Sequence, residues 1–235
     1  MGKIGQVSLF RSKPMEVIML TYDDIRKDES IKKYITAADA SLSALGFTEH
    51  SFAHVGRVSE FSARILESLG YDGHTVELAK IAGYLHDIGN LVNRIEHSQS
   101  GAVMAFRILD NMGMDAEDIA TVVTAIGNHD EGTGVPVNAV AAALILADKS
   151  DVRRSRVRNQ DFATFDIHDR VNYSVEGSEL IINGKDVTLE LTIDTGISSL
   201  MDYFEIFLAR MMLCRKAADR LGMTFRLVIN GQQFI

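Results

Sequence analysis

The chain has 235 residues, of which 46% are hydrophobic and 24% are charged, and its formal net charge is −8. This composition is ordinary for a globular protein with a sizeable core. The excess of acidic residues argues against a general nucleic-acid-binding protein and suits a protein that attracts cations. We therefore expect no nucleic-acid partner.

The single cysteine, Cys214, excludes an intramolecular disulfide and a cysteine-based zinc site. It lies in an apolar helical pattern, which indicates a buried side chain. No stretch is long and apolar enough to span a bilayer, and charged residues and Pro14 interrupt the apolar patches near the N-terminus, unlike in a secretory signal. We expect a cytoplasmic protein with no membrane partner.

The predicted elements divide the chain into an N-terminal segment (1–30), a helical domain (31–161) and a small α+β appendage (162–235). The first clear helical stripe of the helical domain spans residues 51–69, where Gly70 ends the helix. This stripe consists of Val55, Val58, Phe61, Ile65 and Leu69.

Four more segments complete the predicted helical domain. Residues 76–89 are apolar almost all round, so we expect a central, buried helix. A helix is predicted within residues 93–113, and Asp115 can cap the next one. The loop 131–136 contains two glycines and a proline, and residues 137–157 form the last long predicted helix.

The pattern changes after about Asp161. Residues 170–194 alternate β-favouring and polar residues, with turn signals at 176–178 and 183–185, which predicts a strand meander. A helix over 198–221 and a strand over 224–229 follow. The helix has a wide apolar face, so we expect a tight contact with the helical domain or a homodimer. The appendage has no cluster of metal-ligand residue types, and we expect no catalytic residues in it.

Inward-facing polar residues occur on four of the predicted helices. Their helical spacing places them on the apolar stripes or at the end of the buried helix. All are of types that divalent metals accept, so together they favour a metal site. They are His54, His86, Asp87, His129 and Asp148, with Asp151 one turn later.

Three motifs carry a resemblance to a known family. The segments "HVGRV", "LHDIG" and "LADKSD" occur in the order of the HD superfamily of metal-dependent phosphohydrolases, over about residues 51–158. This resemblance implies an all-helical bundle. The chain is most similar to the HD-GYP branch, the cyclic-di-GMP phosphodiesterases. It departs from that branch at Asn90, Asn128 and Val135, positions associated there with metal count and cyclic-dinucleotide recognition.

The resemblance also implies a ligand set for two divalent metal ions, of iron, manganese, magnesium or zinc. One ion would be held by His54, His86, Asp87 and Asp148. The second would be held by His97 and His129, with Asp87 as a bridge between the two ions and thus a catalytic residue.

Two such metals would lower the pKa of a bridging water, and the resulting hydroxide would attack phosphorus. The phosphate also needs cationic help from the protein, for which Lys149, Arg153 and Arg154 are candidates. Asp130 and Asp151 are candidates for orienting the ligands.

We therefore expect a metal-dependent phosphohydrolase, a monoesterase or diesterase, acting on a small phosphorylated substrate such as a nucleotide. One alternative is a mixed-valent di-iron oxygenase of the same superfamily, similar to myo-inositol oxygenase. Another is a weakly catalytic HD domain that binds a nucleotide and signals through its appendage. Metal identity separates the two enzymes, and turnover of a phosphoester separates the hydrolase from the signalling domain.

Overall fold

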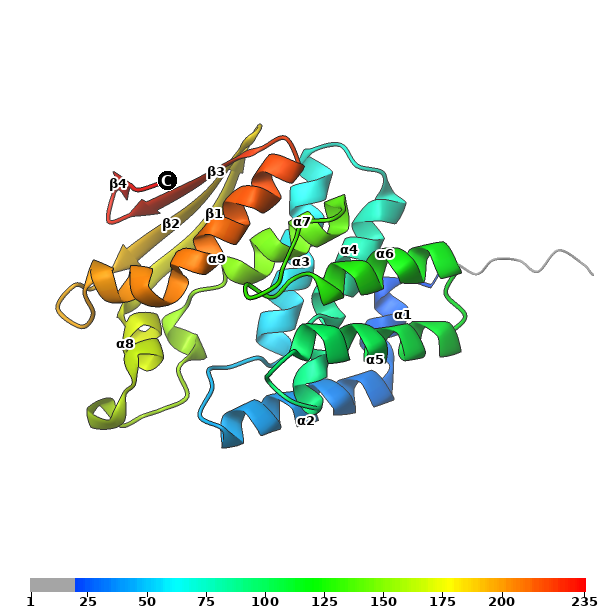
Figure 1. Ribbon diagram of the computed structural model, residues 1–235, viewed down its shortest axis with the longest axis horizontal. Helices are drawn as coiled ribbons and strands as arrows, with labels where there is room; N and C mark the ends of the chain where they lie inside the picture. The colour runs from blue at the N-terminus through cyan, green and yellow to red at the C-terminus, as the bar shows by residue number, and fades with distance from the viewer. Residues whose placement is uncertain (1–19) are drawn as a thin grey trace, which may run out of the picture.

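The helical part is formed by seven α-helices, one of which is buried at its centre (Figure 1). The structure, a computed structural model, describes residues 20–235, so most of the predicted N-terminal segment lies outside the described residues. The helices are α1 (Tyr22–Lys27), α2 (Glu29–Ala44), α3 (Phe52–Ser68), α4 (Gly73–Leu85), α5 (His97–Asn111), α6 (Ala116–Gly127) and α7 (Ala139–Lys149).

Short polar side chains begin these helices. Asp28, Ser51, Asp72, Asp115 and Asn138 each accept a hydrogen bond from a backbone amide of the first turn of the helix that follows. Such caps satisfy amides that have no partner within the helix. The caps therefore fix where each helix starts, and with it the depth at which its polar side chains enter the bundle.

The central helix is α7. Its residues from Val140 to Leu146 are at most 1% exposed, and they contact α3, α4 and α6. Helices α3 and α4 approach closely at Gly83, where an added Cβ would lie 2.7 Å from the Cα of Ser59. This close approach brings the ends of α3 and α4 to the same side of α7.

The C-terminal part is a four-stranded sheet with two helices. Two short 3-10 turns, η2 (Arg154–Arg156) and η3 (Phe162–Thr164), lead to α8 (Ile167–Ser174). The sheet order is β1-β2-β3-β4, with β2 and β3 parallel and joined by α9. The remaining bounds are β1 (Val175–Asn183), β2 (Asp186–Ile193), α9 (Leu200–Arg220), β3 (Thr224–Ile229) and β4 (Gln232–Gln233).

The prediction of a mainly α fold with a helical bundle and a small α+β appendage is confirmed, but three details are wrong. Residues 170–174 belong to α8 rather than to a strand, because Asp166 caps a helix there. The predicted turn at 176–178 is an irregularity inside β1, where the pairing with β2 shifts after Val175. The predicted helix 137–157 ends at Lys149, and the chain leaves it at Ser150.

Helix α9 lies between the sheet and the helical part (Figure 1). On the sheet side, the ring of Phe204 lies 5.4 Å from that of Phe234. On the other side α9 packs on α7, and Arg220 Nη2 donates to the carbonyl of Val137 at 3.4 Å. The tight contact expected for this helix is therefore within one chain. The homodimer and the division at residues 30 and 161 stay predictions.

Within residues 20–235, no helix combines the length and the hydropathy needed to cross a bilayer.

Candidate metal centre

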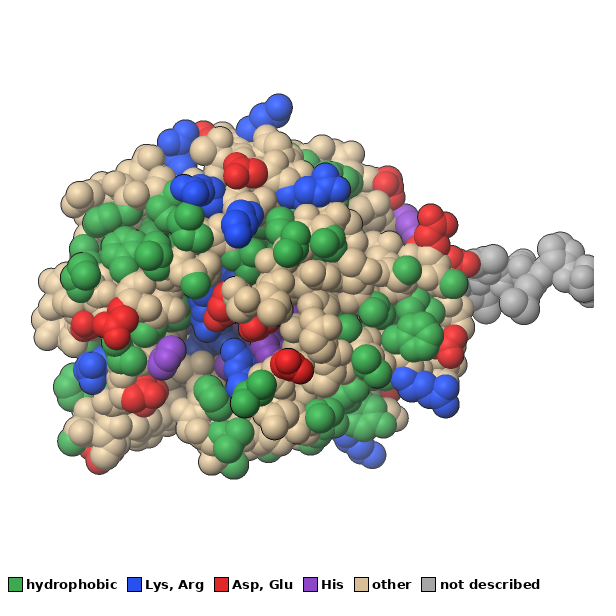
Figure 2. Space-filling view, in the orientation of Figure 1, with side chains coloured by type: hydrophobic (Ala, Val, Ile, Leu, Met, Phe, Trp, Pro, Cys, Tyr) green, Lys and Arg blue, Asp and Glu red, His purple; other side chains and the backbone are tan. Residues whose placement is uncertain are grey.

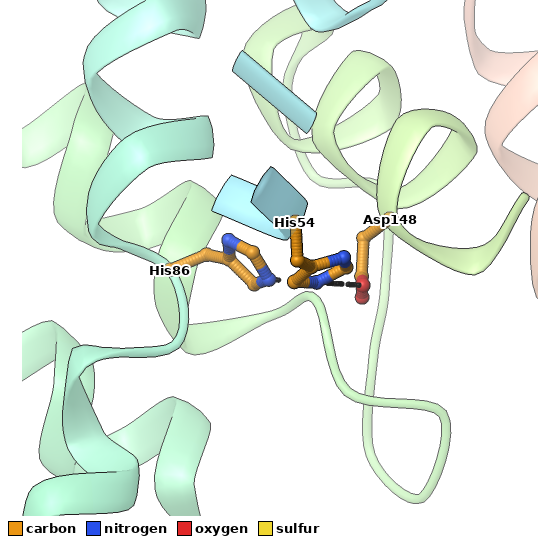
Figure 3. Close-up of side chains that lie close together, drawn as sticks. All are labelled: His54, His86 and Asp148. Carbon is orange, nitrogen blue, oxygen red and sulfur yellow. Dashed lines mark ion pairs between the residues drawn. The ribbon is translucent and has the colours of Figure 1, made fainter. Parts of the chain in front are cut away.

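The ends of five helices converge on one buried point. The side chains there come from α3, from the end of α4, from the start of α5, from the residue pair after α6 and from the last turn of α7. Figure 3 shows three of them pointing toward one another, from α3, α4 and α7. The full set is His54, His86, Asp87, His97, His129 and Asp148, which are the six predicted metal ligands.

Gly89 and Gly101 let the turn that follows Asp87 approach helix α5 closely. The turn η1 (Ile88–Leu91) packs against α5, and an added Cβ at Gly89 would overlap the carbonyl of His97. At Gly101 an added Cβ would lie 3.1 Å from the carbonyl of His86. At Gly89 only a residue without a side chain fits, and at Gly101 an added Cβ would require the neighbouring backbone to shift. Gly89 and Gly101 thus allow the start of α5 to pack against the end of α4.

The spacing of the first group fits a shared cation. His54 Nε2 lies 3.3 Å from Asp148 Oδ1, and His86 Nε2 lies 3.2 Å from Asp87 Oδ2. His54 Nε2 also lies 3.5 Å from Asp87 Oδ2. Two ligands that are each about 2.1 Å from one metal lie roughly 3 Å apart. These distances therefore match neighbouring corners of a coordination shell.

Hydrogen bonds fix the ring orientation of these histidines. Nδ1 of His54 donates to Asp151 Oδ2 at 2.7 Å, and Nδ1 of His86 donates to the carbonyl of Gly83 at 2.8 Å. Nδ1 of His129 donates to the carbonyl of Ile126 at 2.6 Å. With the Nδ1 proton used in this way, each Nε2 presents a lone pair to the centre.

Three atoms of the cluster are buried and have no hydrogen-bond partner among the described residues: His54 Nε2, His86 Nε2 and Asp87 Oδ2. Buried polar atoms without partners are rare, because each costs desolvation free energy. Here the three atoms face a common point. A divalent cation satisfies all three at once, so the residues present fit a metal ion.

A second group overlaps the first. His97 Nε2 lies 3.1 Å from His129 Nε2 and 3.5 Å from Asp87 Oδ1. Ligand atoms of His86, Asp87 and His129 also lie close enough to hold a metal together. Asn90, in place of the lysine of the HD-GYP branch, donates to Asp87 Oδ1 at 2.9 Å and so orients this carboxylate. The described residues thus contain two adjoining groups of potential ligands.

The electrostatics of the cluster are set by burial and by opposite charges. Burial disfavours the charged form of His86, but the carboxylates of Asp87 and Asp148 outweigh it and raise its pKa to about 10. Burial lowers the pKa of His129 well below its usual value. A metal ion would take the place of the proton that His86 otherwise shares with the carboxylates.

The predicted catalytic cations have carboxylate partners. Lys149 is 4% exposed, and its Nζ lies 2.8 Å from Asp148 Oδ2 and 2.7 Å from Glu131 Oε2. Arg153 Nε donates to Asp151 Oδ1 at 2.6 Å. Both side chains therefore hold carboxylates next to the ligands. Their predicted contact with a phosphate stays a prediction.

Of two other predicted residues, Arg154 and Asp130, only Asp130 lies near the centre. Arg154 points elsewhere, because its Nε donates to the carbonyl of Tyr173 and its guanidinium lies over that ring. Asp130 Oδ1 lies 3.9 Å from His97 Nε2, close enough to influence this ligand. The contribution of Asp130 to catalysis stays a prediction.

A cavity of about 390 Å³ adjoins the cluster. In Figure 2, basic, acidic and histidine side chains gather around a hollow in the middle of the visible face. Sequence reasoning missed this cavity, including its lining from the appendage. Its charged and polar lining residues are Thr48, His50, Arg94, Glu131, Arg156, Asp166, His168, Asp169, Asn172 and Arg210.

A chain of charges links the appendage to the cluster. Arg210 of α9 donates to Glu131 Oε1 at 2.9 Å, and Glu131 Oε2 forms an ion pair with Lys149 Nζ at 2.7 Å. Lys149 in turn pairs with Asp148. The cationic partners Lys149 and Arg210 hold the pKa of Glu131 far below its usual range, although burial opposes this. In the sequence Arg210 is one charge on an amphipathic helix, 79 residues from Glu131, and no local pattern indicates this pair.

Fold and cluster together define a helical bundle with a buried group of histidines and aspartates that could hold metal ions. The profile of the family described as HD domain matches residues 51–169, just over half of the chain. The chain therefore belongs to the HD domain family, and the resemblance of the motifs to the HD superfamily is confirmed. The closer similarity to the HD-GYP branch stays a prediction.

The chain is also similar to two other proteins. The chain is 25% identical over 185 residues to the "Uncharacterized protein MJ1020" of Methanocaldococcus jannaschii, across 68% of this chain and 71% of that protein. It is 27% identical to a predicted HD superfamily hydrolase of known crystal structure, from an uncultured Thermotogales bacterium. That match has a TM-score of 0.43 and covers 53% of this chain and 67% of the other.

Proposed function

We propose that this chain is a metal-dependent phosphohydrolase that acts on a small phosphoester such as a nucleotide. The observation that carries the proposal is the convergence of His54 Nε2, His86 Nε2 and Asp87 Oδ2, buried and without partners, beside an open cavity. Membership of the HD domain family supports the same reading.

In this proposal His54, His86, Asp87 and Asp148 hold one divalent ion. A second ion is held by His97 and His129 together with Asp87. Divalent ions in such a site supply Lewis-acid activation of the phosphoryl group and of a water molecule.

The remaining residues position these ligands. Asp151 fixes the ring of His54 and leaves its Nε2 free. Lys149 offsets the charge on the second oxygen of Asp148, at 2.8 Å, so that Oδ1 stays turned toward His54. The side-chain amide of Asn90 donates to Oδ1 of Asp87 at 2.9 Å and so orients this carboxylate.

The cavity limits the size of the substrate. About 390 Å³ is within the range of small-molecule sites, which are roughly 300–1,000 Å³. Three arginines and three carboxylates line it, and of the arginines only Arg94 has no carboxylate within ion-pair distance in the described chain, which favours an anionic group beside it. The side chains of α8 offer hydrogen-bonding groups to the rest of the molecule. A nucleoside or sugar phosphate has this combination of groups.

The test is a phosphate-release screen with nucleotides, cyclic dinucleotides and sugar phosphates. The chain would be loaded separately with manganese, zinc, iron and magnesium, and its metal content measured. We expect Asp87→Asn to lose both metal and turnover. The control Asp186→Asn changes an exposed carboxylate of β2 and should retain both.

Two outcomes would contradict the proposal. A metal-loaded protein that hydrolyses no phosphoester but binds a nucleotide would be a signalling domain. A bound pair of iron ions with oxygen-dependent turnover would place the chain with the oxygenases.

A further inference from the structure

The basic side chains around the cluster differ in one respect, which is whether a carboxylate already neutralises them. Lys149 lies within 2.8 Å of two carboxylates, and Arg210 lies 2.9 Å from Glu131. Arg153 pairs with Asp151 at 2.6 Å and Arg156 approaches the same carboxylate at 3.8 Å. These four cations balance charges that the protein itself has placed beside the metal ligands.

Arg94 has no carboxylate within ion-pair distance in the described part of the chain, residues 20–235. Its Nη1 instead lies 3.2 Å from Nε2 and 3.4 Å from Nδ1 of His97, and its own carbonyl accepts from His97 Nδ1 at 3.1 Å. The guanidinium also lies 5.8 Å from the ring centroid of Phe47. Arg94 is half-buried, so its positive charge is partly withdrawn from water without a counter-charge.

The position of Arg94 joins the cluster to the cavities. It lines the 390 Å³ cavity and also a second one of about 690 Å³, which His97 and Asp130 line as well. A group in either cavity can therefore lie beside Arg94. The charge of Arg94 is therefore available to a ligand at the point where the ligand would meet the centre.

The contact of Arg94 with His97 is one that a bound cation would replace. The donor Nη1 uses the Nε2 lone pair that the second ligand group needs. A cation at that lone pair would repel the guanidinium unless an anion lay between them. A phosphoryl group supplies that anion, and its oxygens match the planar fork of arginine.

We propose that Arg94 binds the phosphoryl oxygens of the substrate, in the role that the sequence suggests for Lys149 or Arg153. This assignment rests on the proposed phosphohydrolase function. Arg94 then exchanges a neutral partner, His97, for a charged one when substrate and metal are both present. The aromatic ring of Phe47 keeps the guanidinium near the centre.

The test uses the metal-loaded protein, with inorganic phosphate as the probe. Binding of phosphate is measured by calorimetry for the unchanged chain, Arg94→Gln, Arg94→Lys and the control Arg107→Gln. Arg107 is an exposed residue of α5, the helix that begins three residues after Arg94, and no acidic residue lies within ion-pair distance of it in the described chain. Metal content is determined for every sample.

We expect Arg94→Gln to weaken phosphate binding by about tenfold to a hundredfold, the loss expected for a charge-assisted hydrogen bond. Metal content should stay unchanged, Arg94→Lys should recover part of the affinity, and Arg107→Gln should bind like the unchanged chain. With a turned-over substrate, Arg94→Gln should raise KM or lower kcat, whereas the metal content stays full.

Three results would overturn the inference: phosphate affinity within twofold of the unchanged chain in Arg94→Gln, loss of metal in that variant, or no phosphate binding by the unchanged metal-loaded protein. The second result would make Arg94 a support for His97. The inference and the proposed function fail separately, because turnover is measured on the unchanged chain and the Arg94 effect is measured as phosphate affinity.

Discussion

Asp151→Asn tests how strongly the metal centre depends on a carboxylate that binds no metal itself. Asp151 is buried, and its Oδ2 accepts from His54 Nδ1 at 2.7 Å and from Arg153 Nη2 at 3.0 Å. Its Oδ1 accepts from Arg153 Nε at 2.6 Å and lies 3.3 Å from Arg57 Nε. Asparagine has the same shape, but one of the two oxygens becomes an NH2 group.

The magnitude follows from these contacts. If the NH2 group takes the place of either oxygen, its N–H groups point at the hydrogen-bond donors of His54 or Arg153. At least one hydrogen bond from the charged guanidinium of Arg153 is then lost. Breaking a buried ion pair by removing one partner costs about 3–5 kcal/mol of stability. Loss of a carboxylate that orients a metal-binding histidine lowers metal affinity roughly 10–100-fold, about 1.4–2.7 kcal/mol.

The assay combines calorimetric metal titration with denaturant unfolding of the metal-free protein. We expect Asp151→Asn to be destabilised and to bind metal more weakly, by the amounts above. Asp186→Asn is the matched control, since its partner Arg226 is 3.2 Å away on an exposed surface. It should change stability by no more than about 1 kcal/mol. If Asp151→Asn bound metal as tightly as the unchanged chain, the orienting role of this carboxylate would be refuted.

Three further predictions concern other parts of the molecule. Gly89→Ala should destabilise the protein by about 1–3 kcal/mol in denaturant unfolding, because its Cβ would overlap the carbonyl of His97; Gly73→Ala, where a Cβ meets nothing within 4 Å, is the control. Burial raises the pKa of Cys214 to about 12, so the thiol stays protonated at pH 8 and should react with a thiol reagent only after denaturation; rapid reaction of the native protein would contradict this. Replacing His97 and His129 together with alanine should halve the metal content, and an unchanged metal-to-protein ratio would indicate a single ion.

The convergence of the candidate ligands on one point could be predicted because most of it depends on local information. His54 shares a helical face with apolar residues, and His86 and Asp87 end a helix that is apolar all round. Helical periodicity predicts which side chains point into the bundle. Several inward-facing side chains of types that bind metals are therefore expected to meet at one place. The resemblance to known motifs added His97, which periodicity alone does not place.

The surroundings of the ligands could not be predicted in the same way. The predicted helix over 137–157 continues past Lys149 on periodicity, but the chain leaves it so that Asp151 can meet His54, 97 residues away. Residues 170–174 alternate like a strand, yet a capping aspartate starts a helix there. These outcomes depend on partners distant in sequence, which a local pattern does not contain.

The charges between Arg210 and Asp148 have a thermodynamic consequence. Through Glu131 and Lys149 they connect α9 of the appendage with a proposed metal ligand. Linkage is reciprocal, so an ion that favours the ordered position of Asp148 also favours the docked position of α9. Metal loading should then slow amide hydrogen exchange in α9 and in the strands that it covers, although these elements contain none of the proposed ligands. The exchange rates of the appendage would thus report whether the centre contains metal.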